Sequence, residues 1–524
     1  MDIPRRDLLK LAAGGMAASM MGVSGVFAAV APAGSGTFDV RSFGATGDGS
    51  TIDTPAVNKA IAAASAAGGG RVRFPAGTYA CYSIHLRSSV TLLLERGATI
   101  LAAPSTGSSG YDAPEPDAAW SAYQDYGHNH WHNSLIWGEN IHDFGIAGPG
   151  LIWGKGLDRG GHDHVPEPPG GGNKSIALKN CHNVTLKDFS ILQGGWFGIL
   201  ATGVDNLTIE NLKIDTNRDG MDIDCCRNVR ISNCTVNSPW DDAIVPKSSY
   251  ALGYARATEN VTISNCYVTG AYQLGTLLDG TFKEFAPGAH VSHTGRIKFG
   301  TESNGGFRNI AISNCVFEGC SGLALETVDG ALLEDIAITN LTMRDIVSAP
   351  IFLRLGARMR GPSGAAVGQL RRVLIQNVVA SNVSGKQCSI LTGIPGHRIE
   401  DIQMGDIFIQ HRGGGTRQQA EIRLPEAAGK YPEPNMFGIT PAQGFYLRHV
   451  QGIDMSHIEI ESLRPDDRPS FLLDDVRDAD FLRIEAPRET GVPVFSLRNV
   501  EDFSSALVRG VADKNMKQVS QRDF

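Results

Sequence analysis

Two short segments hold the residues with the clearest capacity for chemistry. Asp219 lies in the segment 217–220, and Asp241 and Asp242 are adjacent to each other 22 and 23 residues further on. Carboxylates that share one site repel one another, which raises at least one pKa and can leave one acid protonated near neutral pH. Hydrolysis of a glycosidic bond needs such a set, because one carboxyl group protonates the leaving oxygen while another carboxylate activates water.

A structural interpretation of the same aspartates is that they stabilise turns, since Asp-Gly is a common turn sequence. For Asp222 and Asp224, which alternate along an expected strand, we favour that structural role. The adjacent pair Asp241 and Asp242 is harder to explain by turn geometry. We therefore favour a catalytic role for the pair.

A repeat along the chain explains how these aspartates would be brought together. Asparagine followed by apolar-x-apolar occurs at Asn183, Asn206 and Asn228 and continues less regularly to Asp401. The alternation is typical of strands, and a return near 22 residues is typical of a solenoid, whose stacked coils bury a continuous core. The sequence predicts an all-β right-handed parallel β-helix; a sandwich or a propeller is disfavoured, since a propeller blade needs about 40 residues. In such a stack Asp219 and Asp241 lie about one strand spacing (~4.8 Å) apart.

The chain divides into a leader and one repeat domain. Residues 1–33 contain a twin-arginine pair and a small, weakly apolar stretch, which predicts an export signal peptide; a membrane anchor is the disfavoured alternative. Residues 34–524 are expected to form a single β-helix whose open N-terminal end is capped by a short helix over 57–67. Inserted loops are expected near 103–133, 170–173, 272–294 and 356–370. We expect a periplasmic or secreted monomer without membrane contact after signal cleavage.

Composition argues against several other functions. A net charge of −8 without a basic run disfavours nucleic acid as a partner, since phosphate binding needs clustered Lys and Arg. Cys234, Cys266 and Cys315 each end the same tetrapeptide, Ile-Ser-Asn-Cys, and are interpreted as buried residues of the repeat. The cysteines lack the paired spacing and neighbouring histidines of a zinc site, so we expect no metal and no cofactor.

Several motifs together resemble glycoside hydrolase family 28, the polygalacturonases. The opening segment, 38–79, resembles a start that several β-helix families share. Asn217-x-Asp219-Gly220, the Asp241-Asp242 pair and Lys247-Ser248 resemble the motifs of the family's active site. The resemblance covers roughly residues 37–360. It implies that Asp241 is the general acid, that Asp219 and Asp242 hold and deprotonate the attacking water with inversion of configuration, and that Asn217 orders the site.

Two departures from the family pattern concern the substrate. The family's Gly-His-Gly is absent before the matching step at Gly300–Gly306, and His293 is the nearest replacement. Where the family has Arg-Ile-Lys to grip a substrate carboxylate, this chain has Glu326. The tripeptide Arg296-Ile297-Lys298 stands one coil too early, by coincidence or relocation. Because Glu326 would repel a uronate, we predict a neutral sugar such as rhamnose, galactose or xylose at the cleaved position.

Aromatic side chains are expected to support the sugar rings, whose faces are partly apolar. Trp196 and Trp240 are the first candidates. The insertion 105–132 either forms a wall of the cleft or packs its own aromatic side chains. If the loops 111–133 and 272–294 close the cleft into a pocket, the enzyme acts from chain ends. The full set of expected substrate-binding residues is Asn217, Lys247, Trp196, Trp240, His293, Arg296, Lys298, Glu302 and Glu326.

The sequence thus predicts a glycoside hydrolase acting on a pectin-like or related plant or algal polysaccharide or oligosaccharide. One alternative is a polysaccharide lyase or epimerase on the same fold, in which the aspartates would bind calcium through oxygen ligands. Another is a non-catalytic carbohydrate-binding β-helix. An intact set of three aspartates argues against the second alternative.

Overall fold

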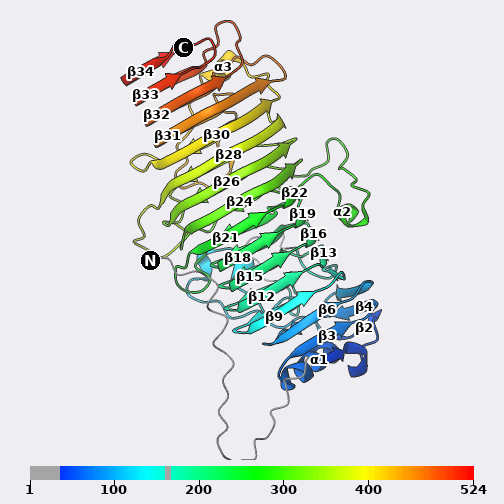
Figure 1. Cartoon of the computed structure of the whole chain (residues 1–524). Helices are drawn as coiled ribbons and strands as arrows, with labels where there is room; N and C mark the ends of the chain where they lie inside the picture. The colour runs from blue at the N-terminus through cyan, green and yellow to red at the C-terminus, as the bar shows by residue number, and fades with distance from the viewer. Residues whose placement is uncertain (1–35, 160–166) are drawn as a thin grey trace, which may run out of the picture.

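The computed structural model describes residues 36–159 and 167–524, and it confirms the predicted right-handed parallel β-helix (Figure 1). The chain winds through coil after coil, and successive coils pair their equivalent strands in parallel up to the last coil. The predicted signal peptide, 1–33, lies outside the described residues. Among those residues, none of the helices combines the length and the apolar character that crossing a membrane would require.

Three sheets form the walls of the coil stack. One wall, here called the broad sheet, contains β1 (Thr37–Asp39), β3 (Gly70–Phe74), β6 (Val90–Leu94), β9 (His142–Ala147), β12 (His182–Lys187), β15 (Asp205–Glu210), β18 (Arg227–Ser232), β21 (Thr258–Ser264), β24 (Phe307–Glu318), β26 (Leu332–Arg344), β28 (Gln369–Val383), β30 (Ile399–His411), β31 (Phe445–Ser462), β32 (Phe471–Glu485), β33 (Phe495–Ala506) and β34 (Lys514–Asp523). Only the last pair, β33 and β34, is antiparallel within this sheet.

A second wall carries the predicted active site and is here called the site sheet. Its strands are β5 (Ile84–His85), β8 (Ile136–Glu139), β11 (Lys174–Lys179), β14 (Phe197–Thr202), β17 (Asp219–Asp224), β20 (Ile244–Lys247), β23 (Lys298–Phe299), β25 (Leu323–Thr327), β27 (Ile351–Leu355) and β29 (Ser389–Thr392). The third wall consists of β2 (Asp48–Ile52), β4 (Gly77–Cys81), β7 (Ala98–Ala102), β10 (Leu151–Trp153), β13 (Ser190–Leu192), β16 (Lys213–Asp215), β19 (Thr235–Asn237) and β22 (Tyr267–Thr269).

The recurring asparagines form a ladder along one corner of the stack. Asn206, Asn228 and Asn260 all have a left-handed backbone, with φ between 53° and 59°, a conformation that asparagine tolerates better than most residues. The side-chain amide of each asparagine donates to the side-chain oxygen of the asparagine one coil earlier, at 3.2 Å from Asn228 and 3.1 Å from Asn260. The asparagine of the repeat therefore turns the corner and links the coils.

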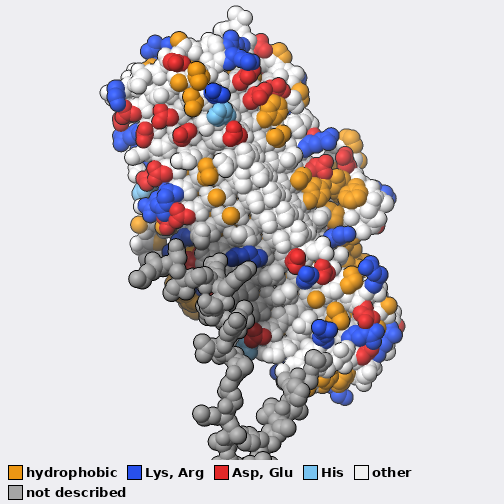
Figure 2. Space-filling view, in the orientation of Figure 1, with side chains coloured by type: hydrophobic (Ala, Val, Ile, Leu, Met, Phe, Trp, Pro, Cys, Tyr) orange, Lys and Arg blue, Asp and Glu red, His pale blue; other side chains and the backbone are white. Residues whose placement is uncertain are grey.

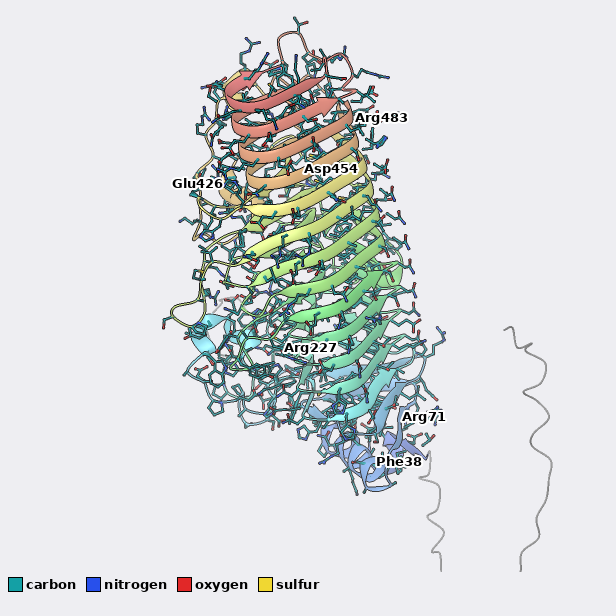
Figure 3. All side chains as sticks on the ribbon, turned by 60° about the vertical axis from the view of Figure 1, so that its left-hand side comes forward. Phe38, Arg71, Arg227, Glu426, Asp454 and Arg483 are labelled. Atoms are coloured by element: carbon teal, nitrogen blue, oxygen red, sulfur yellow. The ribbon has the colours of Figure 1, made fainter. Side chains whose placement is uncertain are left out.

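The apolar residues of the repeat fill the interior. Val184, Leu207, Val229 and Val261 are in register in successive coils and are buried. All nine cysteines are buried with free thiols, as expected for the residues that end the Ile-Ser-Asn-Cys repeats. Figure 3 shows the charged side chains Arg227, Asp454 and Arg483 projecting from the broad sheet outside this core.

The N-terminal helix is present and begins three residues earlier than predicted. It is α1 (Thr54–Ala66), and Pro55 stands in its first turn, where a missing backbone N–H costs nothing. Val57, Ala60 and Ile61 on its inner face are buried, so the helix covers the open end of the apolar core. A short 3-10 helix, η1 (Val40–Phe43), packs beside it.

Long connections interrupt the coils near the site sheet. The chain between β7 and β8 contains η2 (Ser121–Tyr123) and η3 (Tyr126–His128), and the chain between β22 and β23 contains α2 (Thr276–Asp279). In Figure 2 hydrophobic side chains gather on the projection that carries α2, and Phe282 there is exposed. A further insertion, 412–444, was not predicted; it contains α3 (Arg417–Ala420) and η4 (Pro434–Phe437), and its Glu426 lies beside the stack in Figure 3.

Candidate active site

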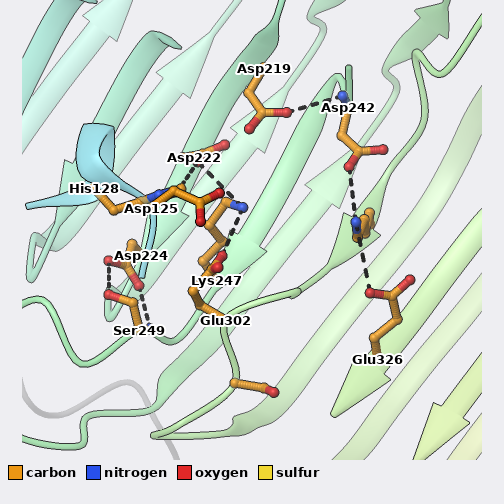
Figure 4. A network of polar contacts seen from close by, with 12 residues as sticks. Asp125, His128, Asp219, Asp222, Asp224, Asp242, Lys247, Ser249, Glu302 and Glu326 are labelled. Carbon is orange, nitrogen blue, oxygen red and sulfur yellow. Dashed lines mark hydrogen bonds and ion pairs between the residues drawn. The ribbon is translucent and has the colours of Figure 1, made fainter. Parts of the chain in front are cut away.

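The three predicted carboxylates converge at the start of β17 and β20. One carboxylate oxygen of each of Asp219, Asp241 and Asp242 lies within 4.8 Å of the other two. The register differs from the prediction, because Met221 lies opposite Ile244 and the step is 23 residues at this point. Asp219 therefore lies opposite Asp242 and not Asp241, and the backbone N–H of Asp242 donates to Asp219 Oδ1 at 3.1 Å (Figure 4).

The surroundings of the three carboxylates are unequal. Asp219 and Asp242 are buried, whereas the Asp241 side chain is 28% exposed and lies 3.2 Å from the Arg218 guanidinium. Burial, with the neighbouring charges of Asp222 and Asp241, raises the pKa of Asp219 well above its usual range. Burial alone would raise the pKa of Asp242 too, but the charges of Arg296 and Lys298 outweigh it and hold that pKa below its usual value. The site thus combines an ionised carboxylate with one that retains its proton more readily.

The tripeptide Arg296-Ile297-Lys298 belongs to this site. Its coil follows the coil of the aspartate pair directly, since Ile244 bridges Ile297 and the backbone N–H of Ala243 donates to Arg296 O. Arg296 Nε donates to Asp242 Oδ1 at 2.8 Å, and Lys298 Nζ lies 3.4 Å from Asp242 Oδ2. The structure therefore places the basic pair beside Asp242, although it stands one coil earlier than the family pattern.

Glu326 occupies the next coil and differs from the prediction in its surroundings. Its side chain is fully buried, 3.8 Å from Lys298 Nζ, so it faces the basic pair and not an open sugar position. Burial, partly opposed by Lys298, raises the pKa of Glu326 to about 8. At neutral pH this acid therefore holds its proton, which lowers the electrostatic cost of placing a third acid near Asp242 and the basic pair.

A second charged cluster lies further along β17 and β20. Lys247 Nζ lies 3.2 Å from Glu302 Oε2 and 3.7 Å from Asp222 Oδ2. His128, from the chain between β7 and β8, contacts Asp222 at 3.0 Å (Figure 4). Asp222 was interpreted as structural, yet it joins this cluster behind Asp219 and contributes to the raised pKa there. The predicted residues Lys247 and Glu302 are thus brought together.

Asp224 has the structural role expected of it. Its carboxylate accepts hydrogen bonds from the backbone N–H of Ser249 at 2.8 Å and from the Ser249 hydroxyl at 2.6 Å. Asn217 is half-buried, and its side-chain oxygen has no hydrogen-bond partner among the described residues. That oxygen is itself buried, two residues before Asp219.

Trp196 cannot serve as the sugar platform that the sequence suggested. It is 0% exposed, because Phe197 and Tyr126 stack near it and the Arg218 guanidinium lies 4.9 Å from its ring centre. Its role is to support Arg218, which in turn contacts Asp241. Trp240 is half-buried, with Phe285 against one edge, and it remains the better candidate for contact with a sugar.

His293 lies at the base of the α2 connection. Its Nδ1 is 2.9 Å from the Gly270 carbonyl oxygen, and its ring packs edge-on against Phe285. Arg296 is the residue of this connection that contacts Asp242.

The loops around the site are joined to one another. In the chain between β7 and β8, Asp125 forms a 3.0 Å ion pair with Arg360 from the predicted insertion 356–370. Trp120 of the same connection donates to the Ala251 carbonyl at 3.1 Å. Trp131 is buried against the site sheet. The insertion 105–132 therefore combines the two alternatives that the sequence left open: it packs its own aromatic side chains, and it borders the site.

Sequence reasoning missed the residues that the insertion 412–444 contributes. Tyr431 is 53% exposed, and Lys298 Nζ lies 5.1 Å from its ring centre. Glu433 contacts Arg296, and its Oε1 lies 3.1 Å from Lys298 Nζ. These residues stand more than 130 positions after the basic pair, in a segment without the repeat, so no local signal could reveal them. His128 was similarly hidden among several histidines of one insertion.

Comparisons with known proteins agree with this architecture. A family model described as a right-handed β-helix region matches residues 170–283, which include the three aspartates; a model described as rhamnogalacturonase A/epimerase, pectate lyase-like, matches residues 37–111, which do not. A probable polygalacturonase from Vitis vinifera is 25% identical over 402 residues, covering 70% of this chain and 73% of the relative.

Two solved structures share the fold. An exopolygalacturonase from Thermotoga maritima has a TM-score of 0.61 at 17% identity and covers 81% of this chain and 91% of its own. A family 28 exopolygalacturonase from Yersinia enterocolitica has a TM-score of 0.60 at 17% identity, covering 86% and 79%. The resemblance to the polygalacturonases is thus confirmed at low identity, on a right-handed parallel β-helix.

Proposed function

We propose that this polygalacturonase-like glycoside hydrolase cleaves a glycosidic bond next to a neutral sugar in a pectin-like or related polysaccharide or oligosaccharide. The observation that carries the proposal is the convergence of Asp219, Asp241 and Asp242 to within 4.8 Å. Hydrolysis of a glycosidic bond needs a proton donor and a carboxylate that activates water, and this arrangement supplies both. The relatives named above act on polygalacturonate by their names, which supports the substrate class.

The unequal surroundings support a division of roles. Asp241 is the most exposed of the three, so its side chain is suited to reach the leaving oxygen, and the family resemblance assigns it the role of proton donor. Asp242 is kept ionised by Arg296 and Lys298, which suits a base that takes a proton from water. Asp219, on the neighbouring coil, orients that water.

Inversion of configuration is part of the proposal. The carboxylate oxygens are closer than the about 6.5–9.5 Å that separates the two carboxyl groups of most inverting enzymes. A third carboxylate changes the geometry, because Asp219 and Asp242 can hold one water between them while Asp241 acts on the other side of the bond. The family resemblance in the sequence implies the same outcome.

A neutral sugar at the cleaved position follows from the charges around the basic pair. Arg296 and Lys298 are buried and already face Asp242, Glu326 and Glu433. A uronate would add a further negative charge beside Asp242 and Glu433, and like charges in one site disfavour each other. The hydroxymethyl or methyl group of a neutral sugar would add no charge at this position.

We further propose that the enzyme removes sugars from chain ends after export by the twin-arginine route, as a monomer. The ion pair between Asp125 and Arg360 joins two insertions beside the site, and the insertion 412–444 borders the basic pair. Such joined loops favour a closed end to the site. Products that are monomers from the first minutes would support this mode, and a ladder of oligosaccharides would contradict it.

The decisive experiment is a reducing-sugar screen over rhamnogalacturonan, homogalacturonan and neutral galactans. Asp241→Asn is expected to lower kcat by about 10²–10⁴-fold, the usual contribution of a general acid, with an unchanged melting temperature. Asp188→Asn, at a half-buried site on another coil, is the matched control and keeps full activity. Full activity of Asp241→Asn would refute the assignment, and a product with an ultraviolet-absorbing double bond would show a lyase.

Nuclear magnetic resonance of the first products tests the stereochemistry separately. Inversion predicts that the anomeric signal of the released sugar is opposite to that of the substrate before mutarotation. Retention would show that one of the closely spaced carboxylates acts as a nucleophile.

A further inference from the structure

The insertion 412–444 sends one carboxylate into the basic pair of the site. Glu433 hydrogen-bonds Arg296 and lies 3.1 Å from Lys298 Nζ. Both cations belong to the coils and are buried, whereas the Glu433 side chain is 26% exposed. It therefore approaches the pair from outside the β-helix, where the bound part of a substrate would also approach.

The contact of Glu433 with Arg296 and Lys298 resembles the binding of an anionic ligand. A carboxylate between a guanidinium and an ammonium makes charge-assisted hydrogen bonds, the usual way in which proteins bind anionic groups. Asp242 contacts both cations and Glu326 contacts Lys298, and both of these acids belong to the coils. Glu433 is the carboxylate from a loop, so it occupies the position that an external anion would take.

The neighbouring tyrosine fits the same interpretation. Tyr431 is two residues earlier, is largely exposed, and has both Lys298 and Arg358 near its ring, at 5.1 and 5.9 Å from the ring centre. An exposed aromatic ring beside an ion pair can support a sugar face while the acid decides which substituents the sugar carries.

We infer that Glu433 is a specificity-determining residue: its carboxylate fills an anion position on Arg296 and Lys298 and excludes a uronate from the sugar position beside Asp242. The inference rests on the proposed function, because it assumes that a sugar binds beside Asp242. It deepens that function by assigning the preference for neutral sugars to one side chain. Removing this carboxylate should convert the position into a uronate site.

Binding of monosaccharides tests the inference without any need for hydrolysis. Galacturonic acid and galactose, which differ only in the carboxylate, are titrated calorimetrically into the mature wild-type protein, Glu433→Ala and Glu433→Gln. We expect Glu433→Ala to bind galacturonic acid at least about tenfold more tightly than wild type, since it vacates two charge-assisted contacts. Glu433→Gln, which still fills the space, should gain much less. Binding of galactose should change little in either variant.

Matched controls separate charge from general loosening of the loop. Glu426→Gln alters another acid of the same insertion, one that contacts Arg448 and His449, and should leave galacturonic acid binding unchanged. If Glu433→Ala does not fold, Glu433→Ser, which also vacates the position, takes its place. Acetate should raise the melting temperature of the Ala variant more than chloride does.

Two results would overturn the inference. The first is a wild-type protein that binds galacturonic acid more tightly than galactose. The second is a folded Glu433→Ala variant that gains no affinity for galacturonic acid, which would make Glu433 only an anchor of its loop. Neither result depends on hydrolysis, whereas failure of the proposed function would appear as undiminished activity of Asp241→Asn.

Discussion

The coils near the site have two polar regions, and different kinds of interaction stabilise them. On the corner of the broad sheet, Asn228 pairs with Asn206 and Asn260, the same residue type in the adjacent coils. On the site sheet, the backbone N–H of Asp242 donates to Asp219, and the Asp242 carboxylate contacts two cations that are in turn held by Glu433 from a distant insertion. The ladder is uncharged and local, and the site is charged and assembled from far apart.

The difference shows what a repeat can and cannot provide. Stacking identical amides satisfies each hydrogen-bonding group with the next copy, so the ladder grows with the number of coils. Stacking identical carboxylates would accumulate repulsion, so a site with several acids needs cations from outside the repeat pattern. The insertions therefore complete the site electrostatically as well as bordering it.

The largest expected effect comes from removing the cation that links the coils to the insertion. Arg296→Met keeps the side-chain length but leaves Asp242 and Glu433 without their guanidinium. Breaking a buried ion pair by removing one partner costs about 3–5 kcal/mol, and we expect a loss of that size in the free energy of unfolding. Activity should fall too, because Asp242 would lose one of the two cations that hold it ionised.

Urea unfolding measures this loss, and an exposed arginine on the broad sheet provides the comparison. Arg372 pairs with Asp335 at 2.7 Å in a largely exposed setting. Arg372→Met should cost no more than about 1 kcal/mol, as for other surface ion pairs. Equal losses for the two variants would show that the site is no more dependent on its cations than the surface is.

The contrast also explains how much the sequence could reveal. Asn183, Asn206 and Asn228 predicted the coils, and the Asp241-Asp242 pair predicted the position of the site, because both depend on local spacing. The contact of Asp219 with Asp242 instead of Asp241 was missed because the step is one residue longer there. The burial of Trp196 was missed because it depends on an insertion that carries Tyr126 across it.

A smaller effect is expected from Glu326, and it depends on pH. The pKa of Glu326 is about 8 in the folded protein against an ordinary value of 4.5. Between these values the folded state holds a proton that the unfolded state has released, so this acid makes stability fall as pH rises from about 4.5 to 8. Glu326→Gln removes that titration and should flatten the dependence.

Melting temperatures of wild type and Glu326→Gln from pH 4.5 to 9 measure the difference. We expect similar stability near pH 4.5 and a relative gain for the variant of up to a few kcal/mol near pH 8, because each unit of pKa shift of the buried acid corresponds to about 1.4 kcal/mol. Both Glu326 oxygens indeed lack a hydrogen-bond partner among the described residues. Parallel curves across this range would mean that Glu326 titrates as an ordinary acid.

The smallest effect is expected on the ladder, where two contributions can be separated. Asn228→Ala loses two amide hydrogen bonds and places alanine at φ 57°, a left-handed conformation that costs about 1–2 kcal/mol without glycine or asparagine. Asn228→Gly loses the same hydrogen bonds but adopts that backbone freely. Thermal unfolding should therefore rank wild type above Gly and Gly above Ala, with hydrolysis unchanged in both. A Gly variant as unstable as the Ala variant would show that the hydrogen bonds of the ladder, and not the shape of the corner, make asparagine the residue that recurs.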